Sequence, residues 1–305
     1  MFLLLVIFTA GCDRLHDDLS GCNLFLRFRY DYNLAHEDWF CQQVEQIQVF
    51  VFDSQDKYLS TFKESGDKLK SPEYKMQIPY QMQGCTFVVW AGKTENLYSI
   101  PTLMPGDPIE KLTLKFEPQD NKFSDQLDAL WHSGPDRMIF PDENKTTQTV
   151  SLIRNTNEVS VGLSHTDGTD INISDFDIVI KGANGSYDYR NTFLSDCSTI
   201  TYSPYTFTNT PAVAARISTL RFVKQNKVTM SILNKQTGEI VSIGGEKEID
   251  IVAYFLKRDP DAMEDQEYLD RRYIWDVSVN FDKKSYIALS IAINGWTTWF
   301  QPSDI

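Results

Sequence analysis

The sequence has few histidines, no CxxC pair and no apolar run long enough to span a membrane as a helix. The four histidines are His16, His36, His132 and His165, and none lies three or four residues from another. This spacing excludes the common helical metal-binding pairs. The motifs HExxH, GxSxG and GxGxxG and a Walker loop are also missing. We therefore expect a protein that is not an enzyme and uses no metal or cofactor.

Positive charge is scarce as well. The chain of 305 residues has 29 Lys and Arg against 42 Asp and Glu, which gives a net charge of -13. Proteins that bind nucleic acid usually carry a basic patch, so we expect no nucleic-acid partner. An acidic body is also repelled by anionic lipid, which fits a body held off a membrane by a tether.

The N-terminal residues resemble a bacterial lipoprotein signal. The run from Phe2 to Phe8 is entirely apolar, and Ala10 and Gly11 place small residues directly before Cys12. The pattern predicts a signal peptide over residues 1–11, a diacylglycerol on Cys12 and a polar tether over residues 12–22. Thr9 stands where such signals usually have Leu, and no basic residue precedes the apolar run. The alternative is a buried N-terminal strand that ends in Gly-Cys.

Four cysteines remain once Cys12 is assigned to lipid. They are Cys22, Cys41, Cys85 and Cys197, an even number in a chain expected to enter an oxidising compartment. One or two disulfides or free buried thiols are both compatible with this count. The spacing does not specify a pairing.

Most of the chain alternates between apolar and polar residues with period two, which is typical of half-buried strands. Residues 23–32 place Leu24, Leu26, Phe28 and Tyr30 on one face. Residues 47–62 form a hairpin candidate around a polar turn, and Pro79 suggests that the strand at 74–80 lies at a sheet edge. Further strands are predicted at 86–91, 112–116, 150–163, 171–180, 199–206, 228–233, 249–256, 275–281 and 286–293.

Two segments have helical spacing. Residues 123–131 predict a short helix or turn, and residues 261–272 predict a helix lying over a sandwich. Residues 239–245 predict a hairpin tip. The polar stretch 141–148 suggests a boundary between domains at 23–147 and 148–305. Short strands separated by turns predict an all-β, mainly antiparallel fold of β-sandwiches with minor helix.

Candidate binding residues are few. Trp296 and Trp299 follow Asn294-Gly295 near the C-terminus and are the leading candidates for contact with a partner or a glycan, with Trp39 as a third surface candidate. Trp90 and Trp275 lie in apolar strands and are expected in the core. His132 is interpreted as a packed structural histidine. Residues 167–172 have alternating oxygen ligands but lack the spacing of a calcium loop, so we expect an exposed turn.

Several stretches, in this order along the chain, resemble the FimB-type family of fimbrial anchor and accessory subunits of the Bacteroidetes. Each motif is weak alone, but their order together with the lipoprotein signal is specific. The resemblance covers essentially the whole chain, with Ser133 where the family typically has Gly. The matching stretches are residues 17–22 (DDLSGC), 26–33 (LRFRYDYN), 49–53 (VFVFD) with 58–59, 89–92 (VWAG), 130–132 (LWH) with 151–157 (SLIRNTN), and 293–296 (INGW).

The resemblance implies two tandem transthyretin-like Greek-key β-sandwich domains. It also implies an outer-membrane lipoprotein, exposed at the cell surface, that attaches a fimbrial shaft and binds pilins or accessory subunits by strand addition. The segment after Ile293 is a candidate contact in that process. A glycan-binding surface lipoprotein is the alternative function, and an accessory subunit at the tip or along the shaft is a third possibility.

Overall fold

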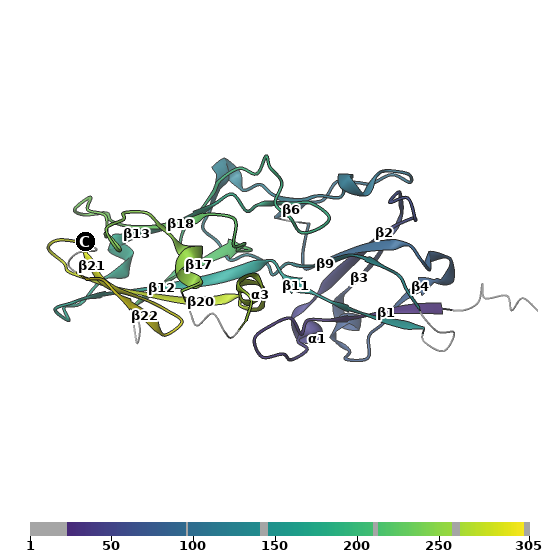
Figure 1. Ribbon diagram of the computed structural model, residues 1–305, viewed down its shortest axis with the longest axis horizontal. Coiled ribbons are helices and arrows are strands. Elements are labelled where there is room, and N and C mark those ends of the chain that lie inside the picture. The colour runs from purple at the N-terminus through teal and green to yellow at the C-terminus, as the bar shows by residue number, and fades with distance from the viewer. Residues whose placement is uncertain (1–22, 96, 141–145, 210–212, 258–262, 302–305) are drawn as a thin grey trace, which may run out of the picture.

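The computed structural model describes residues 23–95, 97–140, 146–209, 213–257 and 263–301. The molecule is elongated, with two lobes arranged along its long axis (Figure 1). Strand β1 lies in the lobe at one end, and β21 and β22 belong to the lobe at the other (Figure 1). We call these the N-lobe and the C-lobe.

The N-lobe contains two sheets. One has three strands in the order β10-β1-β4 and the other has five in the order β11-β9-β5-β2-β3. The pairings are antiparallel except for β1 with β10, which is parallel. The strands are β1 (Asn23–Arg29), β2 (Gln46–Phe52), β3 (Tyr58–Ser65), β4 (Met76–Pro79), β5 (Thr86–Ala91), β9 (Trp131–Arg137), β10 (Thr147–Ser151) and β11 (Ile153–Arg154), with α1 (Phe40–Gln43), η2 (Gly66–Lys70) and η3 (Tyr80–Met82) between them.

The C-lobe is built on a six-stranded sheet in the order β16-β17-β12-β20-β21-β22 and a five-stranded sheet in the order β19-β18-β13-β15-β8. The longest ladder joins β12 and β20 in parallel. The elements are β12 (Thr156–His165), η6 (Ile173–Asp175), β13 (Phe176–Gly182), β15 (Ile200–Tyr202), β16 (Thr206–Thr208), β17 (Ala214–Leu220), β18 (Val228–Asn234), β19 (Ile249–Asp250), α2 (Ile251–Phe255), α3 (Asp265–Arg271), β20 (Ile274–Phe281), β21 (Ala288–Ile293) and β22 (Trp296–Trp299).

A segment between β5 and β9, residues 97–130, crosses from the N-lobe to the C-lobe. Its strand β7 pairs with β14 and β6, and its strand β8 adds in parallel to β15 at the edge of a C-lobe sheet. The division into domains at residues 147 and 148 stays a prediction. The elements of this crossing segment and its partner are β6 (Tyr98–Ser99), η4 (Ile109–Lys111), β7 (Leu114–Phe116), η5 (Gln119–Asn121), β8 (Lys122–Phe123) and β14 (Ser186–Tyr187).

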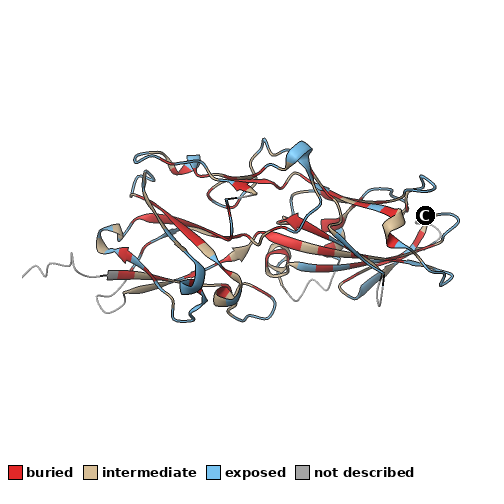
Figure 2. Ribbon diagram, turned by 180° about the vertical axis from the view of Figure 1, so that it is seen from behind, coloured by how far each residue is buried: buried red, intermediate tan, exposed pale blue. Residues whose placement is uncertain are grey.

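Two hydrophobic cores explain why β2 and β5 are apolar on both faces. Val49 and Val89 pack into the core between the two N-lobe sheets. Phe50, Phe52 and Trp90 point the other way, into a larger core shared with the crossing segment and the C-lobe. Every residue of β5 and every residue of β2 after Gln46 is therefore buried, and buried residues run along strands in both lobes (Figure 2). This arrangement confirms the all-β, mainly antiparallel sandwich fold that the alternating pattern predicts.

Several local predictions are confirmed. Strands β2 and β3 form the expected hairpin, and β4 is an edge strand that ends at Pro79. Helix α3 lies within the predicted 261–272. Trp90 and Trp275 are fully buried.

Two local predictions are wrong. The short helix or turn expected at 123–131 is absent because Phe123 belongs to β8, while Leu130 precedes β9 and is held in the core. The strand expected at 249–256 turns into helix α2 after two residues, because the Asp250 carboxylate accepts hydrogen bonds from the first amides of that helix. The hairpin tip expected at 239–245 is, by contrast, confirmed, because Gly244 and Gly245 form a two-residue turn that is closed by an antiparallel bridge between Ile243 and Glu246.

The cysteines that the structure describes are unpaired. Cys41 and Cys197 are half-buried and Cys85 is buried, and all three are free thiols. A disulfide among these three is therefore excluded as an interpretation of the sequence. Cys22 and the predicted lipid attachment site, Cys12, lie outside the described residues.

Stacked arginines join the two lobes. The Arg154 guanidinium lies 4.0 Å from the ring centre of Tyr273 in the C-lobe and 5.6 Å from that of Trp131 in the N-lobe. Arg271 of α3 stacks on Tyr32 of the N-lobe in the same way, at 4.0 Å. Burial lowers the pKa of Arg154, because desolvation disfavours the charged guanidinium, and the aromatic faces offset part of that cost. The joint is therefore made of packed, partly desolvated contacts.

His132 lies at the same joint, beside the crossing segment. Its ring packs 4.5 Å from that of Trp90, and its Nε2 lies 3.1 Å from the carbonyl oxygen of Tyr189. Since a carbonyl only accepts hydrogen bonds, Nε2 must be the protonated ring nitrogen. The interpretation of His132 as a packed structural histidine is confirmed. Complete burial lowers its pKa from 6.5 to about 3.

This burial predicts a pH dependence of stability. The unfolded chain protonates His132 near pH 6.5, whereas the folded chain does so only near pH 3. Between those values the unfolded state binds more protons, so the free energy of unfolding falls as the pH falls, by about 1.4 kcal/mol per pH unit from this group. Urea unfolding from pH 7 to pH 3.5 measures the slope. His132→Gln should reduce this slope. Equal slopes in the wild type and His132→Gln would contradict the assignment.

Candidate partner-binding edge

The last two described strands form a tight hairpin. Strands β21 and β22 pair in antiparallel register, with Ile293 opposite Trp296. The two residues between them, Asn294 and Gly295, have φ of 49° and 88°. Positive φ at both central positions is the type I′ turn, which Asn-Gly adopts at little cost because its twist matches that of the strands.

The rest of the C-lobe holds this hairpin in place. The Asn294 backbone amide donates to the Asp276 carbonyl at 2.8 Å, and the Asn294 side-chain oxygen accepts from the Asp276 amide at 3.0 Å. Its side-chain nitrogen donates to the Tyr268 hydroxyl of α3 at 3.3 Å. The turn is thus fixed to both β20 and α3, so β22 presents a defined edge.

The outer edge of β22 carries backbone groups that face away from the sheet. In a two-residue hairpin the residues that flank the turn form a hydrogen-bonded pair, here Ile293 and Trp296. Every second residue repeats this orientation, so Trp296 and Thr298 direct their amides and carbonyls toward β21. The Phe300 amide continues this alternation by donating to the Leu289 carbonyl at 3.0 Å. Thr297 and Trp299 therefore direct theirs outward, and no strand in the described part of the chain pairs with that edge.

The two tryptophans of β22 are the most exposed aromatic side chains that the structure describes. Trp296 is 63% exposed and Trp299 is 68% exposed. Because they are three residues apart on a strand, they lie on opposite faces of the sheet. Trp39 is elsewhere, half-buried at the lobe joint with its ring 6.5 Å from that of Tyr273. The three candidate residues thus do not share one flat platform.

Strand β22 also lacks the features that protect the edges of β3 and β4. Exposed edge strands usually carry lysine or proline, which discourages pairing with another chain. Strand β3 carries Lys63 and β4 ends with Pro79, whereas the edge strands β10 and β16 carry neither lysine nor proline. Strand β22 reads WTTW, with no charge and no proline. A partner strand can therefore reach Thr297 and Trp299 without desolvating a charge.

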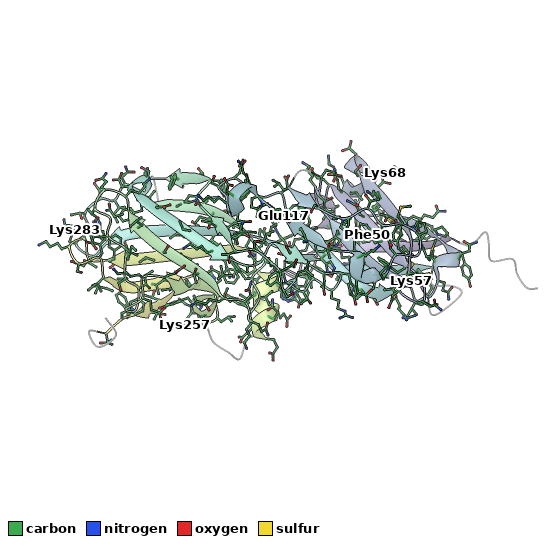
Figure 3. The ribbon with its side chains drawn as sticks, turned by 90° about the horizontal axis from the view of Figure 1, so that it is seen from above. Phe50, Lys57, Lys68, Glu117, Lys257 and Lys283 are labelled. Atoms are coloured by element: carbon green, nitrogen blue, oxygen red, sulfur yellow. The ribbon has the colours of Figure 1, made fainter. Side chains whose placement is uncertain are left out.

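The other candidates from the sequence are placed elsewhere. The segment 167–172 is exposed, as expected, except for the half-buried Ile171, and its Asp167 lies beside Lys283 at the far end of the C-lobe (Figure 3). Lys283 binds the Asp167 carboxylate at 2.7 Å, and this hydrogen bond lowers the pKa of Asp167. Among the described residues no group of three or more His, Cys, Asp or Glu side chains is placed to hold a metal ion. None of the described helices is long and apolar enough to cross a bilayer.

Sequence reasoning missed the part played by Thr297. The Asn-Gly pair between apolar segments is the strongest short-range hairpin signal, and reading it as a turn would have placed Trp296 in a new strand. The outward direction of the Thr297 amide then follows from the alternation of the ladder. That β22 has no further neighbour depends on the whole sheet and has no local signal.

Comparisons with known proteins agree with the fold. A family model described as fimbrillin-A associated anchor proteins Mfa1 and Mfa2 matches residues 19–302. A proposed polysaccharide-binding protein of Bacteroides thetaiotaomicron is similar in structure, with a TM-score of 0.83 at 27% identity over 93% of this chain and 100% of that one. The fimbrial anchor protein Mfa2 of Porphyromonas gingivalis has a TM-score of 0.69 at 16% identity over 92% and 99%. No curated protein sequence matches the chain.

The exposure of the β22 tryptophans predicts a clear contrast in stability. Trp296→Ala and Trp299→Ala should each change the free energy of unfolding by less than about 1 kcal/mol, because neither ring fills a core. Trp275→Ala should cost about 3–5 kcal/mol, since that ring is fully buried and stacks 4.1 Å from Phe255. Urea unfolding measures all three. A loss at Trp299 as large as that at Trp275 would mean that Trp299 is part of the core.

Proposed function

Since the chain belongs to the family of fimbrillin-A associated anchor proteins, we propose that it is a non-enzymatic lipoprotein that attaches a fimbrial shaft to the outer membrane. The family is one of fimbrial anchor proteins and not of enzymes. The geometry that best supports this role is the placement of the predicted lipid-attached end and the candidate partner-binding edge in different lobes. Strand β1, which follows the predicted lipid site, lies in one lobe, and the unprotected edge of β22 lies in the other (Figure 1).

We assign the membrane attachment to Cys12. Its position after Ala10 and Gly11 matches a lipoprotein signal, and β1 begins soon afterwards at Asn23. Two or three acyl chains make such an attachment effectively permanent, because each buried CH₂ contributes about 0.8 kcal/mol. The body then stands on the membrane through β1, with the C-lobe directed away from it.

We assign the contact with fimbrial subunits to the edge of β22. An extended segment of a shaft or accessory subunit would pair with the outward amides and carbonyls of Thr297 and Trp299. The indole rings of Trp296 and Trp299 would cover the added strand from the two faces of the sheet, where each has more than half of its surface to lose. Main-chain bonds provide affinity in such a contact and the two rings provide selectivity.

Glycan binding is the second candidate, favoured by the likeness to a proposed polysaccharide-binding protein and by the exposed tryptophans. Sugar rings stack best on aromatic side chains that share a face. Because Trp296 and Trp299 lie on opposite faces of β22, each face offers a sugar only one stacking residue. An added strand would contact both rings, one on each face, so this arrangement favours strand addition over glycan binding.

The lipid assignment predicts the behaviour of a Cys12→Ala variant. Without the thiol there is no acceptor for diacylglycerol, so the protein should lose the label from a radioactive or clickable fatty acid and leave the membrane fraction. Cys22→Ala is the matched control, because it removes a neighbouring thiol outside the signal, and it should remain labelled and membrane-bound. Labelling of Cys12→Ala at the level of the wild type would sink the assignment.

The edge assignment predicts that Thr297→Pro impairs capture of a fimbrial subunit. Proline removes an amide that faces outward, so the C-lobe should keep its fold while the added strand loses a main-chain bond. Co-purification of fimbrial subunits from cells should fall by about fivefold or more, as expected for loss of one hydrogen bond and the altered edge.

Thr149→Pro, on the exposed edge strand β10 of the other lobe, is the control and should retain full capture. If the Thr297→Pro variant co-purifies as much fimbrial subunit as the wild type does, the edge of β22 is excluded as the contact.

A further inference from the structure

We propose that the parallel ladder between β1 and β10 is a mechanical clamp that bears the load when the two ends of the protein are pulled apart. The inference rests on the proposed function, because it is the attachment of one end to a membrane and of the other to a fimbrium that creates the load. It identifies which of the N-lobe contacts resists that load.

The first observation is the direction of β1 relative to β10. The two strands are parallel, with Phe25 opposite Thr147 and Arg29 opposite Ser151. The ladder begins with the Phe25 amide donating to the Thr146 carbonyl at 2.7 Å and ends with the Leu152 amide donating to the Arg29 carbonyl at 2.8 Å. Tension enters β1 at its N-terminal end and leaves β10 at its C-terminal end. In parallel strands these are opposite ends of the ladder.

The second observation is that β10 leads directly into the C-lobe. Strands β10, β11 and β12 are separated by single residues, Leu152 and Asn155, which are both fully buried. The Asn155 amide donates to the Leu130 carbonyl at 2.7 Å, and its side chain forms a reciprocal amide pair with Asn191 of the C-lobe. Residues 147–165 therefore form one nearly continuous extended run through three sheets, along the long axis of the molecule (Figure 1).

The third observation is that the same arrangement recurs in the C-lobe. Strand β12 pairs in parallel with β20 from Glu158 and Ile274 to His165 and Phe281. Strands β21 and β22 follow β20 and lie in the same sheet. Tension that passes along β12 is thus transferred sideways to β20 and then to the hairpin that carries the proposed partner edge.

The geometry decides how the bonds break. The hydrogen bonds of a ladder run across the strands, so a force along parallel strands that is applied at opposite ends stretches all of them together. A hairpin pulled from its two open ends would instead lose them one at a time. In this fold, β1 is also flanked on its other side by β4, so the strand is held along both edges. The buried Leu24, Leu26 and Phe28 hold its inner face.

The test is the lifetime of the N-lobe at constant force, with a handle in place of residues 1–12 and another after Ile305. In this register the backbone amide of Gln148 points toward β1, between Phe25 and Arg27, and so belongs to the ladder. The backbone amide of Thr149 points away from β1. Gln148→Pro should shorten the N-lobe lifetime by about fivefold or more, because one bond is lost from a ladder that breaks as a unit. Thr149→Pro should leave the lifetime within about twofold of the wild type.

Gln148→Ala is the second control. It removes the side-chain bonds of Gln148 to the Arg137 carbonyl and the Ile139 amide but keeps the backbone amide, so its lifetime should stay near that of the wild type. Equal lifetimes for Gln148→Pro and Thr149→Pro, or for Gln148→Pro and Gln148→Ala, would overturn the proposal.

If Gln148→Pro does not fold, a disulfide between Arg27→Cys and Thr149→Cys, which are register partners, replaces it. The closed bridge should abolish the extension from the N-lobe, and reduction should restore it. An extension that persists with the bridge closed, or thiols that do not form the bridge, would contradict the clamp. None of these measurements involves Cys12 or a partner, so the clamp and the anchoring function can fail separately.

Discussion

The structure depends on one stretch of chain, residues 147–165, that takes part in three sheets in succession. It pairs with β1, then with β9, then with both β17 and β20. The two residues at which it changes sheets, Leu152 and Asn155, are fully buried, so neither can move without opening a core. The relative position of the two lobes follows from this stretch and from the arginines that stack across the joint. A flexible linker at the same place would leave the ends of the molecule free to swing.

The packing of the joint bears directly on an anchoring function. The predicted tether is the polar stretch 12–22, between the lipid site and β1. Beyond it, the parallel ladders, the crossing segment and the stacked Arg154 join the two lobes into one continuously packed body. The acidic composition is consistent with this arrangement, since it disfavours contact of the body with anionic lipid.

The sequence allowed good prediction wherever the determinants are local. Alternation gave β1, the β2–β3 hairpin and the edge position of β4, because side-chain period and turn chemistry act within a few residues. Prediction failed where a capping side chain or a distant strand decided the outcome. Asp250 starts a helix in an apolar run that reads as a strand, and the crossing segment is extended because it adds to C-lobe strands far away in sequence. For the candidate edge, exposure of Trp296 and Trp299 was foreseen, but their opposite orientations depend on the register of β22.

If this protein is the fixed end of a fimbrium, with its N-lobe at the membrane and its C-lobe holding the shaft, it lies at the base of that fimbrium. Immunogold labelling of intact cells with an antibody against this chain measures that position. We expect gold where the fimbrium meets the outer membrane. Gold concentrated at the free tips or along the shafts would contradict this position and would make the chain a subunit of the fimbrium itself.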